Sequence, residues 1–220
     1  MLGLGLNIYR VNFTGSTSSD SETHVFLLAG QSNMVGRPTF DGGAGYPSGT
    51  LQYPQATGLG YPFATMQAIF DAVPSIVAIK DWCNDPMLHE KHIRNFQSRQ
   101  RPVNVLTTHS SWLMASLSMG PAGLLSGAGS VIADLQVALF EAIQAHDLAA
   151  ARAANDRIYP LAQAFYRAPF LDMHNRMKVC LQLLGRIDAA FVRPPLMPLT
   201  SAEIEELKAA LVASGLLPDA

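Results

Sequence analysis

The sequence predicts an α/β fold built on a parallel sheet, followed by a helical region. The first observation is an alternation of short apolar runs with segments of helical periodicity, which repeats roughly every 22–25 residues from Tyr53 onward. A repeat of this length is typical of parallel strands joined by right-handed crossovers. The second observation is that the pattern becomes purely helical after Asp147. We therefore expect a strand–helix region at residues 51–147 and a helical region at residues 148–220.

The first 50 residues read as a separate N-terminal fragment and linker. Residues 6–13 form a possible strand, and residues 24–30 (HVFLLAG) form a second, buried-strand candidate. Small polar residues at 14–21 separate the two. Residues 36–50 are rich in Gly, Pro and Asp, which indicates a loop.

The strand–helix region contains three further apolar runs of strand length, at residues 76–80, 103–107 and 123–126. We expect helices before, between and after these runs, at residues 62–73, 86–97, 111–119 and 132–145. The helix at 62–73 has apolar residues at helical spacing, the one at 86–97 is polar, and the one at 132–145 is strongly apolar.

Three helices are expected after Asp147, at residues 148–166, 173–184 and 201–214. Ser201 is the expected N-cap of the last helix, and Gly215 marks its C-terminal end. The prolines of residues 193–198 (RPPLMP) exclude a helix there.

Composition and charge exclude several classes of protein. The net charge of −2 gives no sign of binding to nucleic acid or an anionic membrane, and no apolar run approaches a membrane span. Cys83 and Cys180 are too few for a disulfide framework and lack metal-ligand spacing. The histidines show no ligand spacing either, which favours surface or packing roles for His89, His92, His109, His146 and His174. We expect a soluble, cytoplasmic protein with no metal, no cofactor and no membrane or nucleic-acid partner.

Lys80 is the main candidate for chemistry. It ends the apolar run 76–80, and alternation along a strand places Ile76, Ala78 and Lys80 on one face. The carboxyl ends of parallel barrel strands are where active sites open. A lysine desolvated there can form a Schiff base with a carbonyl substrate. The alternative is a strand-end lysine that extends to water.

Residues 52–220 resemble the C-terminal half of the dihydrodipicolinate synthase / N-acetylneuraminate lyase family, the class I aldolase barrels. The matching segments occur in the family's order at residues 53–58 (YPQATG), 76–81 (IVAIKD), 123–129 (GLLSGAG), 147–152 (DLAAAR) and 193–196 (RPPL). The resemblance implies a partial (β/α) TIM-type barrel, about the last four strand–helix units, followed by a C-terminal three-helix extension.

The same resemblance implies a lyase or aldolase that acts on 2-oxo acids, with Lys80 as the Schiff-base lysine. It also places Thr57, Ser126, Gly127 and Gly129 at the substrate. The last three end a strand-like run, where backbone N–H groups can bind an anion. The alternative is a turn of small residues that allows tight helix packing.

This chain departs from the family pattern in ways that predict impaired activity. The resemblance does not extend to the first half of the barrel. Leu51 stands where the family carries its proton-relay tyrosine, and Ala56 stands where several members carry a carboxylate-binding arginine. A half-barrel leaves sheet edges open, so we expect a homo-oligomer that completes the barrel, or a poorly folded fusion product.

Residues 23–53 resemble a different family, the sialate O-acetylesterase-like carbohydrate esterases of the SGNH hydrolases. The segment 30–34 (GQSNM) carries the resemblance, and it implies Ser32 as nucleophile, with Gly30 and Asn33 holding the oxyanion. The substrate would then be an acylated sugar. No counterpart of that family's catalytic histidine is found in the sequence. A serine esterase and a non-catalytic fusion remnant therefore stay open as alternatives.

Overall fold

The computed structural model describes residues 25–29, 61–194 and 196–218. Two compact units divide the chain. The sheet unit includes residues 25–29, 61–109 and 119–124, whereas the helical unit includes Ser110–Ser118 and the chain from Leu125 onward. The possible strand at residues 6–13 lies outside the described residues.

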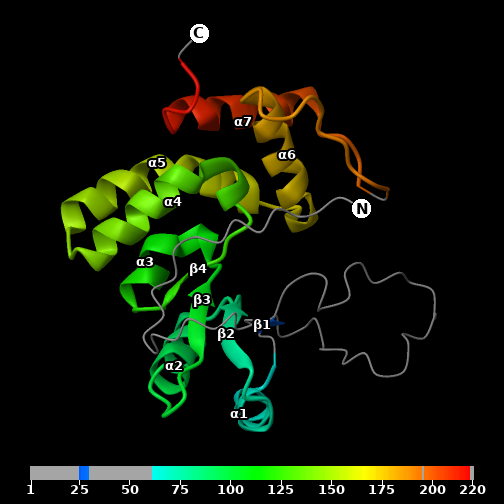
Figure 1. Ribbon diagram of the computed structural model, residues 1–220. Helices are drawn as coiled ribbons and strands as arrows, with labels where there is room; N and C mark the ends of the chain where they lie inside the picture. The colour runs from blue at the N-terminus through cyan, green and yellow to red at the C-terminus, as the bar shows by residue number, and fades with distance from the viewer. Residues whose placement is uncertain (1–24, 30–60, 195, 219–220) are drawn as a thin grey trace. The chain divides into compact units, whose positions relative to one another are not determined.

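The sheet unit is built on four parallel strands in the order β1-β2-β3-β4 (Figure 1). These strands are β1 (Val25–Ala29), β2 (Ile76–Asp81), β3 (Asn104–Thr107) and β4 (Gly123–Leu124). Every neighbouring pair is parallel, which confirms the parallel sheet predicted from the strand–helix repeat. The expected strand at 123–126 is only two residues long, because the chain leaves the sheet after Leu124.

The predicted strand within residues 24–30 is confirmed as β1, and it pairs directly with the strand that carries Lys80. The register aligns Leu28 with Lys80 and Ala29 with Asp81. On its other edge β2 pairs with β3, where Leu106 lies opposite Lys80. The carboxyl end of β2 is therefore held between two neighbouring strands.

Helices α1 (Phe63–Ala72) and α2 (Pro86–Phe96) pack on the sheet through an apolar core. The Phe70 and Phe96 rings meet edge to face, with centroids 4.9 Å apart. Helix α2 begins sharply, because the Asp85 carboxylate accepts hydrogen bonds from the N–H groups of Met87 and Leu88. Its first residue is Pro86, which lacks the N–H that would otherwise be unsatisfied there.

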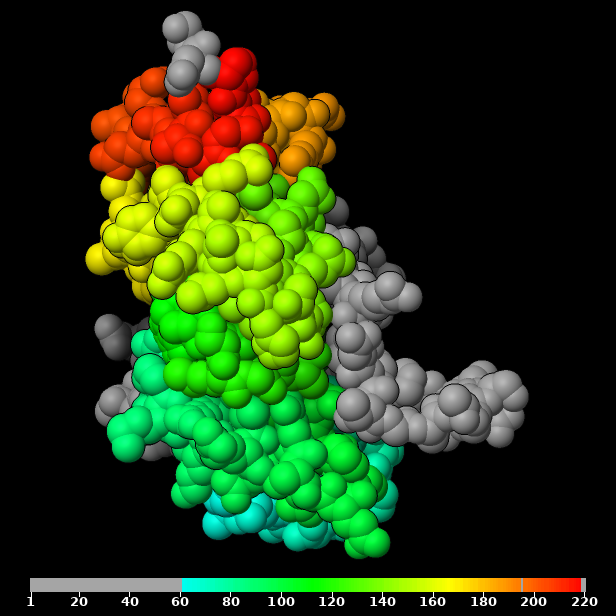
Figure 2. Space-filling model, turned by 90° about the vertical axis from the view of Figure 1, so that its left-hand side faces the viewer, coloured from blue at the N-terminus to red at the C-terminus, as the bar shows by residue number. Residues whose placement is uncertain are grey.

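The helical unit contains a 3₁₀ turn at Ser110–Trp112, then α3 (Leu113–Ser118) and α4 (Gly129–Gln144). Helix α4 starts three residues before the predicted position and has a non-helical residue at Ile132. The three helices expected after Asp147 are confirmed as α5 (Leu148–Tyr166), α6 (Met173–Leu183) and α7 (Ser201–Ala213). Helix α7, red in Figure 2, packs against α5 and α6.

The ends of α7 show one confirmed expectation and one error. Gly215 has φ +67°, the left-handed conformation that ends helices, as expected. The N-cap, however, is Thr200 and not Ser201. Thr200 accepts from the Glu203 N–H while the Glu203 carboxylate accepts from the Thr200 N–H, which forms a capping box.

Within the described residues, no helix is long and apolar enough to span a membrane.

Candidate active site

Lys80 is buried at the carboxyl end of β2, with 5% of its surface exposed. The alternative of a lysine that extends to water is therefore wrong. Burial lowers the pKa of its ammonium group to about 8. At pH 7 roughly one-tenth of such lysines are neutral, against roughly three in ten thousand at the ordinary lysine pKa of 10.5. The side chain thus meets the requirement for an amine nucleophile.

The next residue, Asp81, lies on the opposite face of β2, because side chains alternate along a strand. Its Oδ2 atom accepts hydrogen bonds from Nδ1 of His89 at 2.7 Å and from Nδ1 of His92 at 2.9 Å. Its Oδ1 atom accepts from the Cys83 backbone N–H at 3.1 Å. Burial alone would raise the pKa of Asp81, but the hydrogen bonds from the two imidazoles outweigh it and hold the pKa below the usual range.

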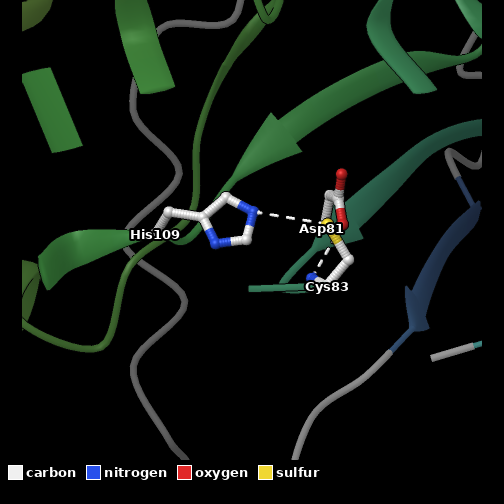
Figure 3. Close-up of side chains that lie close together, drawn as sticks. All are labelled: Asp81, Cys83 and His109. Carbon is white, nitrogen blue, oxygen red and sulfur yellow. Dashed lines mark hydrogen bonds between the residues drawn. The ribbon is translucent and has the colours of Figure 1, made fainter. Parts of the chain in front are cut away.

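Cys83 and His109 complete a buried polar cluster around this carboxylate (Figure 3). The Cys83 Sγ atom lies 3.9 Å from Nε2 of His109. Burial, and then the negative charge of Asp81, raise the pKa of the Cys83 thiol. Burial lowers the pKa of His109 to about 4, although Asp81 opposes the shift. Both groups are therefore neutral at pH 7.

The sequence does not predict this cluster. The expectation is a surface or packing role for His89, His92 and His109; burial excludes the surface role, and His89 and His92 also bond a carboxylate. The sequence does contain one indication of a shared site, since His89 and His92 are three residues apart and therefore share one face of a helix. Helix α2 and His109, which lies two residues after β3, approach Asp81 through tertiary packing, and the spacing of the histidines alone does not show this.

The predicted anion-binding segment lies in the helical unit and uses its polar groups internally. The Gly129 N–H donates to the Ser126 carbonyl at 3.2 Å. The Ser126 hydroxyl accepts from Gln136 Nε2 at 3.1 Å and contacts the Ser110 hydroxyl. Gly127 lies where an added Cβ would be 3.6 Å from His174 Nε2.

In the helical unit, Tyr166 forms hydrogen bonds with Ser110, Ser126 and the Ala128 backbone. Burial raises the pKa of this phenol, and the hydrogen bonds from the two serines only partly oppose the shift. The remaining predicted site residues, Gly30, Ser32, Asn33 and Thr57, lie outside the described residues.

A lysine buried at the carboxyl end of a parallel strand, in a sheet covered by crossover helices, is the arrangement of a barrel enzyme with an amine nucleophile. The model of the dihydrodipicolinate synthetase family matches residues 46–214. The chain therefore belongs to the dihydrodipicolinate synthetase family.

Curated relatives agree with this assignment over part of their length. A 4-hydroxy-tetrahydrodipicolinate synthase of Methanoculleus marisnigri is 32% identical over 143 residues, which cover 64% of this chain and 47% of the relative. An uncharacterised DapA-like lyase of Halobacterium salinarum is 30% identical over 165 residues, which cover 74% of this chain and 51% of the relative. The chain thus spans about half the length of these relatives.

Solved structures show the same partial overlap. YagE of Escherichia coli K12, a member of the dihydrodipicolinic acid synthase family solved in complex with pyruvate, matches with a TM-score of 0.65 and 25% identity. The match covers 75% of this chain and 53% of YagE. Dihydrodipicolinate synthase of Thermotoga maritima has the same fold, with a TM-score of 0.62 and 23% identity over 70% of this chain and 51% of that one. The sheet unit is thus a partial barrel of this fold.

Proposed function

We propose that the protein forms a Schiff base between Lys80 and the carbonyl group of a 2-oxo acid, as a lyase or aldolase of its family. The observation that carries the proposal is the position of Lys80, buried at the carboxyl end of β2 between β1 and β3. Pyruvate is bound in the structure of YagE, which supports a small 2-oxo acid as the ligand here.

The first step needs only the amine and the carbonyl. The neutral Nζ atom of Lys80 adds to the carbonyl carbon, the carbinolamine loses water, and an imine remains. Within the described residues no acid pairs with Lys80, and burial is the cause of its lowered pKa. Thus no ion pair has to be broken before the amine can attack.

The steps that follow imine formation need a proton relay, and we propose that this protein carries them out slowly. The family's relay tyrosine and carboxylate-binding arginine correspond to Leu51 and Ala56, neither of which can take those roles. We therefore expect imine formation to be retained while carbon–carbon bond chemistry is slow.

We also propose that a second copy of the chain completes the barrel, because within the described residues β1 and β4 each have one unpaired edge.

Borohydride trapping with pyruvate tests the imine directly. Reduction should attach pyruvate to the peptide that contains Lys80, as read by peptide mass spectrometry. Lys80→Met should remove the adduct, whereas the exposed Lys91→Met should leave it unchanged. Absence of an adduct on Lys80 in the folded protein refutes the proposal and favours the non-catalytic remnant.

The esterase interpretation stays a prediction. The family match begins at residue 46, after Gly30, Ser32 and Asn33, so it does not bear on that segment. The test is turnover of p-nitrophenyl acetate: equal turnover by the wild type and Ser32→Ala refutes an esterase nucleophile at Ser32.

A further inference from the structure

We propose that Asp81, Cys83 and His109 together bind one divalent transition-metal ion, with Zn²⁺ the best match. Each residue offers one ligand atom, and these atoms all lie within 4.8 Å of one another. Figure 3 shows the three side chains converging from the end of β2 and from the residues that follow β3. All three residues are buried.

The chemistry of the donors selects the metal. A thiolate, an imidazole and a carboxylate are the ligands that Zn²⁺ takes, whereas Ca²⁺ and Mg²⁺ prefer oxygen ligands alone. Tetrahedral Zn²⁺ with ordinary bond lengths separates a sulfur from a nitrogen ligand by about 3.5 Å. The Cys83 Sγ and His109 Nε2 atoms are 3.9 Å apart, so a shift of ~0.4 Å brings them into range.

The carboxylate is already oriented for this role. Its Oδ2 atom accepts from the two imidazoles of α2, and its Oδ1 atom accepts from the Cys83 N–H. A carboxylate has about four lone-pair positions, so about one remains on Oδ1 for the ion. Hydrogen bonds that hold a ligating carboxylate in place are a regular feature of protein metal sites, and His89 and His92 supply them here.

The site is also balanced in charge. On binding, the Cys83 thiol loses its proton to solvent, and His109 keeps its single proton on Nδ1 so that Nε2 can ligate. The charges of the ion, the carboxylate and the thiolate then sum to zero beside a neutral imidazole. A neutral assembly can be buried without the penalty that an isolated charge would incur.

The position indicates a structural role. Asp81 lies on the face of β2 opposite Lys80, so the ion would link the end of β2 to His109 in the segment that follows β3 and would not meet a substrate on Lys80. Three protein ligands leave a fourth position for water or for a further side chain. Metal binding at these three residues does not require Schiff-base formation at Lys80.

Cobalt titration tests the site. The full chain is stripped with a chelator and titrated with Co²⁺, which gives a thiolate-to-cobalt charge-transfer band only when a cysteine ligates. We expect one equivalent to bind with this band, Cys83→Ser to abolish the band, and His109→Gln to weaken binding. Cys180→Ser is the matched control, because Cys180 is the other buried free cysteine and lies on α6.

Thermal unfolding gives a second readout on the wild-type chain. Zn²⁺ at 100 times its dissociation constant should raise Tm by about 5–10 °C. Circular dichroism shows whether each variant is folded. A folded wild-type chain that gives no charge-transfer band, or a band that persists in Cys83→Ser, overturns the proposal whatever the other variants do.

Discussion

Replacing Lys80 by Met should make the protein more stable at neutral pH, which is an unusual result for a buried residue. The ammonium group is buried, with no acidic partner among the described residues, and its pKa falls from 10.5 to about 8. Each pKa unit corresponds to about 1.4 kcal/mol, so burying the charged form costs the fold about 3 kcal/mol at pH 7. Methionine has a similar length and carries no charge, so it should recover much of this cost.

The pH dependence has a definite sign. Because the folded-state pKa lies below the unfolded-state value, the cost is fully present below about pH 8 and disappears as pH rises toward 10.5. At pH 10 the remaining difference should be below about 1 kcal/mol.

Urea unfolding of the wild type and Lys80→Met at pH 7 and pH 10 measures both quantities. Lys91→Met is the control, because Lys91 is exposed and its Nζ lies 4.4 Å from the centre of the Phe63 ring. The control should change the free energy of unfolding by about 1 kcal/mol or less. A Lys80→Met variant that is less stable than the wild type, or whose effect is equal at both pH values, refutes a buried and uncompensated lysine.

Three further predictions concern the helical unit, and urea unfolding checks each. Arg176 is buried and donates to the carbonyls of Phe165, Arg167 and Ala168 at the end of α5, so Arg176→Met should cost about 3 kcal/mol. An unchanged unfolding midpoint would contradict this. Thr200→Ala removes the capping box of α7 and should cost about 1 kcal/mol at pH 7. Hydrogen bonds from Thr200 lower the pKa of Glu203, so this loss should shrink as pH falls below the unfolded-state pKa of glutamate; a loss independent of pH would argue against the cap. Gly215→Ala places a Cβ at φ +67° and should cost about 1 kcal/mol, whereas no loss would show that the helix end relaxes.

The spacing of apolar residues, together with the residues that begin and end helices and strands, predicts most of the fold. This works because the apolar residues that show the spacing also form the core. The run at 76–80 is β2, and the helix expected at 148–166 has those bounds in α5. The error at α7 is local: Ser201 and Thr200 are both good caps, but only Thr200 has a glutamate three residues later. The short β4 reflects where the chain leaves the sheet, which depends on its neighbours.

The candidate site is only partly predictable, because its members meet through tertiary packing. Strand alternation places Lys80 and Asp81 on opposite faces of β2, yet only the structure shows that both are buried. His89 and His92 follow Asp81 within one strand–helix unit, whereas His109 comes after the next strand, and no spacing rule joins all three elements. The end of β2 thus carries an amine on one face and a hydrogen-bonded carboxylate on the other.

We propose the buried amine of Lys80 as the nucleophile that attacks a 2-oxo acid. The most direct measurement is the intact mass of the wild type and Lys80→Met after borohydride reduction with isotopically labelled pyruvate. We expect a single labelled adduct on the wild type and none on the variant. An unlabelled wild type, or equal labelling of both proteins, would contradict this proposal.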